Sequence, residues 1–230
     1  GHNLAEMLEH PEDTPPELHQ TTWCTDRAID FMTADHSGKP WLMSVNIFDP
    51  HAPFDPPRSY LERFDIESMS GPAFRESDLQ AQAKLSAVDF QTTSRRPEEF
   101  NAKWIQAAYY AMIELIDDNV GRMLDTLEQT GQLENTVIIF MSDHGEMLGD
   151  HGLLLKGCRF YEGLVRVPLI VSWAGQFLEN TVRHSLVELT DIAPTLLDLA
   201  GVRIPEQMQG CSLRSLLTDE NATDVHREFV

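Results

Sequence analysis

Apolar residues follow two patterns along the chain: short uninterrupted runs, and longer stretches in which they recur every three or four positions. The runs lie at residues 41–47, 136–141 and 167–172. They predict buried β-strands, with the run at 136–141 covered on both faces. The longest helical pattern extends from Pro97 to about Thr130, and proline is favoured at a first helical position. Together these elements predict an α/β fold with a mostly parallel central sheet and helices on both faces.

Shorter patterns add elements around this framework. They predict a short amphipathic helix at 23–34 with apolar positions Trp23, Ala28, Ile29, Phe31 and Met32, a further short strand at 184–189, a helix from Thr190 or Asp191 to Leu199, and a short helix at 210–217. Residues 55–96 have no clear period and predict an irregular segment that shapes substrate access. The length favours one domain over residues 1–230.

Charge and composition narrow the classes of partner. The sequence has 17 Lys and Arg against 37 Asp and Glu, a formal net charge of −20. Such a field repels nucleic acid, and it would repel an anionic substrate unless a local cation reversed it. Cys24, Cys158 and Cys211 are too few and too widely spaced for a disulfide framework or a zinc cluster, so free thiols are expected.

The sequence shows no targeting signal that identifies the cellular compartment. No stretch approaches the roughly 18 apolar residues of a membrane span, so no membrane span is expected. The chain begins Gly1-His2-Asn3 and shows no basic segment followed by an apolar run. A periplasmic or secreted location is compatible with this start.

Polar residues follow the apolar run at 136–141 directly: Ser142, Asp143, His144 and Gly145. The carboxyl ends of strands line the ligand crevice of open α/β sheets, so a carboxylate oxygen and an imidazole nitrogen can converge there on one ion. The glycine lets the backbone turn sharply away. The alternative is a polar turn that merely closes the strand, because Asp and Gly are common turn residues.

A second histidine also follows an apolar run. His51 lies in Asp49-Pro-His-Ala-Pro-Phe54, after the run at 41–47, in a loop stiffened by its prolines. A histidine in such a loop is often only solvated surface. The alternative is a positioned imidazole that binds an ester oxygen or assists proton transfer to a leaving group.

Taken together, these segments resemble the sulfatase family, within the alkaline-phosphatase-like superfamily of metal-dependent phosphate and sulfate ester hydrolases. The matching segments occur in order as Asp-Pro-His-Ala-Pro-Phe, the long helix, Ser-Asp-His-Gly, Lys-Gly, Arg-Val-Pro-Leu-Ile-Val and Asp-Ile-Ala-Pro-Thr-Leu-Leu-Asp-Leu-Ala-Gly. They span most of residues 41–217. Such a collinear set is far more specific than any one short motif.

The resemblance implies roles for four residues. Asp143 and His144 would ligate a divalent cation, usually Ca²⁺ or Mg²⁺ in sulfatases. Many relatives have Asn in place of His144, and an imidazole also suits Mn²⁺ or Zn²⁺. Lys156 matches the sulfate-binding lysine, whose ammonium would neutralise the ester anion; the alternative is a surface lysine. His51 matches the histidine that contacts the sulfate group.

The nucleophile of the family is missing from the sequence. Sulfatases use a Cys or Ser in Cys/Ser-x-Pro-x-Arg, oxidised to formylglycine, ahead of the Pro-His-x-Pro-Phe loop. None of the cysteines fits this motif, and the paired aspartates of the first strand are also missing. We therefore expect the C-terminal part of a sulfatase catalytic domain, with formylglycine and half of the metal ligands upstream. Such a piece would expose an apolar edge or face that can associate with a second copy.

Three functional hypotheses follow. The first is hydrolysis of sulfate esters by the complete protein, arylsulfatase-like, on a sulfated small molecule or glycan. The second is hydrolysis of a phosphodiester or phosphonate monoester on the same scaffold, since tetrahedral sulfate and phosphate look alike to such a site. The third is a non-catalytic fragment or inactive relative. By itself the chain is expected to be inactive and to bind metal weakly, because Asp143 and His144 leave a hard cation short of ligands.

Overall fold

The computed structural model describes residues 14–85 and 93–222. The chain forms two compact units. The helical unit contains Gly1–Gly131 and His144–Val167, and the strand unit contains Gln132–Asp143 and Pro168–Val230. One domain over the whole length stays a prediction. None of the described helices is long and apolar enough to cross a membrane.

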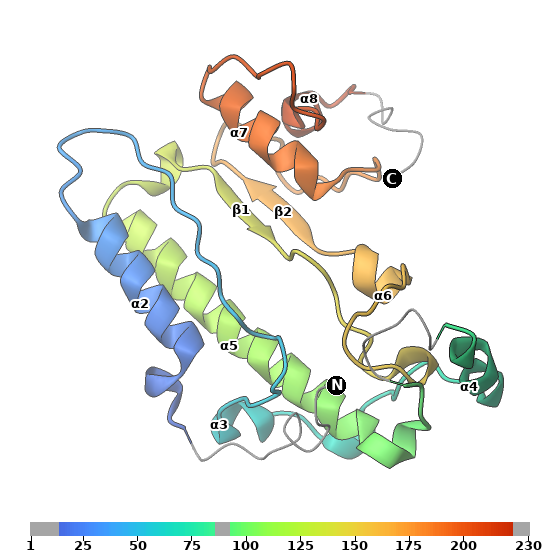
Figure 1. Ribbon diagram of the computed structural model, residues 1–230. Helices are drawn as coiled ribbons and strands as arrows, with labels where there is room; N and C mark the ends of the chain where they lie inside the picture. The colour runs from blue at the N-terminus through green and yellow to red at the C-terminus, as the bar shows by residue number, and fades with distance from the viewer. Residues whose placement is uncertain (1–13, 86–92, 223–230) are drawn as a thin grey trace. The chain divides into compact units, whose positions relative to one another are not determined.

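A single long helix organises the helical unit. This helix, α5, spans Ala102–Gln129, and α2, Gln20–Thr33, packs along it (Figure 1). The first half of α5 is buried almost all round. The other elements of the unit are α3 (Arg58–Leu61), α4 (Glu76–Ala83), α6 (Glu162–Val165) and 3₁₀ turns at Pro16–Leu18, Ile66–Ser68, Pro97–Phe100 and Asp150–Gly152.

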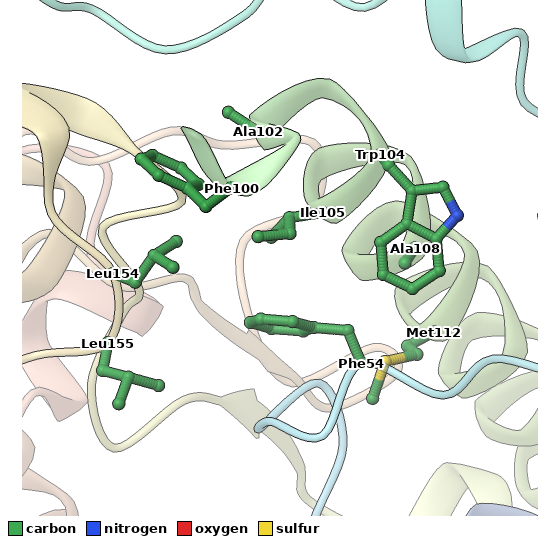
Figure 2. Close-up of a cluster of buried hydrophobic side chains, with 9 residues drawn as sticks. All are labelled: Phe54, Phe100, Ala102, Trp104, Ile105, Ala108, Met112, Leu154 and Leu155. Atoms are coloured by element: carbon green, nitrogen blue, oxygen red, sulfur yellow. The ribbon is translucent and has the colours of Figure 1, made fainter. Parts of the chain in front are cut away.

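The main hydrophobic cluster of the helical unit joins α5 to two loops. Figure 2 shows Phe54 in this cluster with Ile105 on α5 and with Leu154 and Leu155, which come from the segment after residue 144. Phe54 and Ile105 are fully buried. The remaining buried members are Phe100, Ala102, Trp104, Ala108 and Met112. Burying a large apolar side chain contributes roughly 1.5–3 kcal/mol, so this cluster holds the two loops firmly against the helix.

The predicted long helix is wrong in its first turn. Pro97–Phe100 form a separate 3₁₀ turn, and Asn101 stands between this turn and α5 with a φ of 51°. A residue in the left-handed region cannot continue a right-handed helix. The α-helix therefore begins at Ala102, and from there its predicted course is confirmed to Gln129.

The predicted helix around Trp23 is confirmed as α2, but its buried face differs from the predicted one. Ala28 and Met32 are buried as expected, whereas Trp23 is 61% exposed. Thr21 and Thr25 are fully buried instead. The hydroxyl of Thr21 donates a hydrogen bond to a buried carboxylate. A hydrogen bond from Thr21 therefore helps to fix which face of the helix is buried.

The strand unit is built on a two-stranded antiparallel sheet. Its strands are β1, Ile138–Met141, and β2, Leu169–Ser172, with Phe140 opposite Ile170 (Figure 1). Helices α7 (Ile192–Leu199) and α8 (Arg214–Thr218) complete the unit with 3₁₀ turns at Leu133–Asn135 and Leu189–Asp191. A small cluster of Ile192, Leu213 and Leu216 packs against the sheet residues Ile139 and Leu169.

The predicted sheet is only partly present. Runs 136–141 and 167–172 do form strands, but they pair antiparallel and the first is half-exposed rather than covered on both faces. Residues 41–47 form no strand, although burial alternates along them as in extended chain. Residues 184–189 form none either. A strand is defined by pairing with a neighbouring strand, and the sheet in the described residues consists of β1 and β2. The mostly parallel sheet is therefore not confirmed.

Candidate functional site

The His51 side chain is fixed by its own loop. Its Nδ1 lies 2.6 Å from the carbonyl oxygen of Ala52, and its ring lies 4.8 Å, between centroids, from Phe48. A ring nitrogen that faces a carbonyl must carry the proton, so Nδ1 donates the hydrogen bond. The other nitrogen, Nε2, then keeps its lone pair as an acceptor or base.

His144 has the same arrangement and lies close to His51. Its Nδ1 lies 2.9 Å from the carbonyl oxygen of Gly145, which again leaves Nε2 with the lone pair. The two imidazole centroids are 6.5 Å apart. The structure thus brings together two histidines that the sequence placed after two different apolar runs.

Gly145 is required for a reason other than the predicted sharp turn. Its backbone φ is not in the left-handed region. A Cβ at this position would lie 1.8 Å from the carbonyl oxygen of Gly163. The N–H of Gly145 donates to Leu164 and the N–H of Glu146 donates to Gly163. Close backbone approach therefore holds the segment after His144 against α6.

Lys156 is held by a buried carboxylate. Its Nζ lies 3.6 Å from Oε2 of Glu146, whose side chain is 4% exposed. The other carboxylate oxygen, Oε1, accepts hydrogen bonds from the N–H groups of Met147 and Leu155. Burial raises the pKa of Glu146, against the lowering effect of Lys156 and of the backbone donors. The lysine is therefore a positioned cation rather than a free surface side chain.

Tyr109 on α5 lies close to this ion pair. Burial, and then the charge of Glu146, raise the pKa of Tyr109 to about 12. Its ring also makes an edge contact with Phe54 at 6.3 Å between centroids. The phenol therefore stays neutral at physiological pH and adds no charge beside Lys156.

Phe54 connects the histidine loop to the lysine segment. It follows His51 by a few residues and packs with Leu154 and Leu155, which immediately precede Lys156 (Figure 2). The backbone N–H of Leu155 also donates to Glu146. Both polar side chains are thus anchored on one hydrophobic cluster within the helical unit.

Asp143 and His144 offer donors that suit a divalent cation. Asp143 follows β1 and is exposed, and His144 is the next residue in the chain. A carboxylate oxygen and the Nε2 lone pair fit the ligand pair that the sequence predicts. Among the described residues, however, no third His, Cys, Asp or Glu forms a ligand group with them. The role of these two residues as metal ligands stays a prediction.

Comparison with known protein families shows to which family this chain belongs. The family model described as Sulfatase matches residues 1–202. The chain belongs to the sulfatase family. An arylsulfatase of Clostridium perfringens is 35% identical over 226 residues, which cover 97% of this chain and 47% of that protein. The sulfatase resemblance expected from the motifs is confirmed.

Two solved structures share the fold of this sulfatase chain. A phosphonate monoester hydrolase from Silicibacter pomeroyi superposes with a TM-score of 0.83 at 26% identity, covering 96% of this chain and 47% of that one. A structure in complex with its substrate D-glucosamine-2-N,6-O-disulfate gives a TM-score of 0.70 at 25% identity, covering 88% and 52%. The alkaline-phosphatase-like α/β fold is confirmed at this level. The chain spans about half the length of the relatives it matches.

Two features of the sulfatase chain escaped the sequence reasoning. Glu146 directly follows the Asp-His-Gly motif, but nothing in its position predicted that it would be buried against Lys156. A cluster of His19, Asp49 and Asp55 was also missed. The two aspartates stand on either side of His51 in sequence, two residues before it and four after it, and this placement was the available signal. No sequence pattern joined His19 to them.

Proposed function

We propose that the complete protein hydrolyses sulfate esters, and that this chain supplies the groups that hold the sulfate and assist the leaving group. The observation that carries the proposal is the approach of His51 to His144, with Nδ1 of each ring committed to a carbonyl. Each ring is thereby fixed by its own backbone segment, with His51 placed beside the residue proposed below to hold a cation. The 35% identity to an arylsulfatase supports a sulfate ester as the substrate.

Lys156 is the proposed sulfate-binding group. Its ammonium would face the ester oxygens, where negative charge develops in the transition state. Glu146 would hold the ammonium in place, since its buried carboxylate lies 3.6 Å from Nζ. A net charge of −20 makes such a local cation necessary for an anionic substrate.

His51 is the proposed group at the leaving oxygen. With its Nδ1–H held by Ala52, it can act through Nε2, as a hydrogen-bond partner or, once protonated there, as a proton donor. Departure of an alkoxide needs a proton far more than departure of a stabilised phenoxide does. The contribution of His51 should therefore depend on the leaving group.

Asp143 and His144 are proposed to hold a divalent cation together with ligands from the rest of the complete protein. When bound, such a cation supplies positive charge against the sulfate oxygens. Ca²⁺ is the first choice from the family, with Mg²⁺ and Mn²⁺ as alternatives that the imidazole makes plausible. The nucleophile, a formylglycine in sulfatases, is proposed to lie outside these 230 residues.

Rates of the complete protein on matched esters test the proposal. We expect a higher kcat/KM on an aryl sulfate than on an aryl phosphonate monoester or phosphodiester. Lys156→Ala should lower kcat/KM on the sulfate by about 10²–10³. His51→Ala should affect an alkyl sulfate more than nitrophenyl sulfate. His184→Ala, an exposed histidine of the strand unit, serves as the control and should change neither.

Dominant turnover of the phosphonate ester would replace the proposal by its main alternative. The phosphonate monoester hydrolase structure superposes on this chain with a higher TM-score than the structure bound to the sulfated glucosamine. This similarity is the reason for testing a phosphonate ester. No turnover on any of these esters by the complete protein would indicate an inactive relative. The 230-residue chain alone is expected to show no turnover under either hypothesis.

A further inference from the structure

A buried polar cluster beneath the His51 loop is not used by the proposed function. It consists of His19, Asp49 and Asp55, which we call the loop-base cluster. His19 caps the first turn of α2, while the two aspartates stand at the two ends of the loop that carries His51. His19 is 4% exposed and Asp49 is 5% exposed, whereas Asp55 is partly exposed. All three residues lie in the helical unit.

The spacing of this cluster is close to that of ligands around one ion. One ligand atom from each residue lies within 4.8 Å of the other two. Ligand atoms on one ion, with bonds of about 2.1 Å, stand about 3 to 4 Å apart. Nδ1 of His19 and Oδ2 of Asp49 are already 3.4 Å apart. Only a small contraction would place all three atoms on one ion.

One oxygen of the cluster lacks a partner. Within residues 14–85 and 93–222, Oδ1 of Asp55 is buried and has no hydrogen-bond partner. Ionised, the carboxylate is a buried charge with an unsatisfied oxygen; protonated, it still leaves this atom unsatisfied. A bound cation would displace any proton on this carboxylate and supply the missing partner.

The contact between His19 and Asp49 points the same way. Nδ1 of His19 accepts a hydrogen bond from the N–H of Thr21 at 3.4 Å, so it carries a lone pair, yet it also faces Oδ2 of Asp49 at 3.4 Å. Protonating Nδ1 would improve the second contact and lose the first. Burial, followed by the charge of Asp49, also raises the pKa of Asp55, as expected where negative charge is in excess. A cation bound to Nδ1 and Oδ2 would replace the long 3.4 Å hydrogen bond from Thr21 with coordination bonds to both atoms.

We propose that the loop-base cluster binds one divalent transition-metal ion of the Zn²⁺ or Mn²⁺ class. One imidazole and two carboxylates suit such ions, whereas Ca²⁺ takes six to eight oxygen ligands. The ion ties both ends of the His51 loop to the start of α2, and so fixes where the histidine stands. It is separate from the cation proposed at Asp143 and His144, and it does not depend on sulfatase activity.

Metal binding by the 230-residue chain tests this proposal. The chain is stripped with a chelator, checked for folding by circular dichroism, and titrated with Zn²⁺ or Mn²⁺ by calorimetry. Bound metal is counted by mass spectrometry. We expect one equivalent bound with micromolar affinity and a rise in melting temperature. This differs from the weak binding expected from Asp143 and His144 alone.

Three substitutions locate the ion. Asp55→Asn should weaken binding by at least about tenfold. Asp65→Asn is the matched control, because Asp65 is another loop aspartate of the same unit that accepts a backbone N–H, and it should leave the affinity unchanged. Asp143→Asn should also leave it unchanged. An unaltered affinity in Asp55→Asn, or binding that is lost in Asp143→Asn, overturns the proposal.

A second measurement covers the case in which Asp55→Asn fails to fold. Co²⁺ replaces Zn²⁺ in the Asp143→Asn chain, whose substituted side chain is exposed. A visible Co²⁺ absorption with one equivalent bound supports a site at the loop-base cluster. Absence of binding by this chain and by the unaltered chain means that the three residues are held by protons and hydrogen bonds alone, and the proposal is wrong.

Discussion

The helical unit and the strand unit bury their hydrophobic residues in different ways. In the helical unit, α5 is enclosed by α2 and by loops, and Phe54, Ile105 and Met112 are fully buried. In the strand unit, one face of the two-stranded sheet packs on a small cluster, while Phe140 is 37% and Ile170 60% exposed on the other. These two residues lie opposite each other in the sheet.

This difference shows which part of a sulfatase chain is self-sufficient. A helix satisfies its own backbone, so α5 needs only side-chain partners. A strand needs neighbours on both edges, and the strand unit provides one pair of strands in the described residues. His51 and Lys156, whose side chains have fixed partners, lie in the helical unit beside its main hydrophobic cluster. Association of the exposed strand face with a second copy stays a prediction.

Truncation of one aromatic residue in each unit gives the largest expected contrast. Phe54→Ala should lower the free energy of unfolding by about 3–5 kcal/mol, because a fully buried ring is lost and a cavity remains. Phe140→Ala should cost no more than about 1 kcal/mol, because its ring is partly exposed. Denaturant unfolding followed by circular dichroism measures both. Equal losses would contradict the difference between the units.

Glycine-to-alanine changes form the next pair. A Cβ on Gly145 would lie 1.8 Å from Gly163 O, and a Cβ on Gly210 would lie 2.0 Å from Thr190 O. We expect each change to cost about 1–3 kcal/mol, since the backbone must move. Only Gly145→Ala should also shift the imidazole NMR signals of the two site histidines. Gly121→Ala, with open space around it in α5, is the control and should stabilise slightly.

The stability of the helical unit should depend on pH through the protonation of Glu146. Burial raises its pKa above the ordinary 4.5, so the folded state holds this proton more tightly than the unfolded state. The resulting stability is fully present below 4.5 and is lost as pH rises through the folded pKa. Glu146→Gln should remove this decline while keeping the backbone hydrogen bonds through its amide oxygen. Melting temperatures of the unaltered chain and of Glu146→Gln from pH 4 to 8 test this prediction. If the melting temperatures of the two proteins change with pH in parallel, the prediction is wrong.

Asp198 in the strand unit should show the opposite sign with the smallest effect. A hydrogen bond from Ser212, and then Arg214, lower its pKa from 3.8. Its stabilising contribution is therefore present above 3.8 and is lost as pH falls through the folded pKa. Asp198→Asn should cost no more than about 1 kcal/mol at neutral pH, because the pair is solvent-screened. Thermal melts of both proteins at acidic and neutral pH measure this effect. If the variant loses as much stability at acidic pH as the unaltered chain, the prediction is wrong.

The sequence predicted helices better than it predicted the sheet. Helix α5 satisfies its backbone internally, so its period alone gave its course from Ala102 onward. The apolar run at 41–47 has the composition of a strand, yet it forms none because a strand partner lies outside the information in that run. Asn101 interrupted the predicted helix through a backbone conformation that apolar periodicity does not reveal.

Site residues that belong to short sequence motifs could be predicted. Those whose role depends on contacts between distant residues could not. His51, His144 and Lys156 were found from short motifs, and the structure brings the two histidines together. Their roles in catalysis stay predictions. Glu146 was missed because its function depends on burial against Leu155, which no local pattern shows. His19 was missed because it contacts Asp49 only after α2 packs beneath the loop.

The position of Phe54 has a consequence for how this chain can evolve. Phe54 belongs to the loop of His51 and packs with the two leucines that precede Lys156, so a change at this residue would alter the support of both segments. Selection on where His51 and Lys156 stand should therefore act on this buried position as well as on exposed residues. Libraries that vary only the surface would miss it. Leu or Met at residue 54, recombined with changes at Leu154, would be the place to search for such variants.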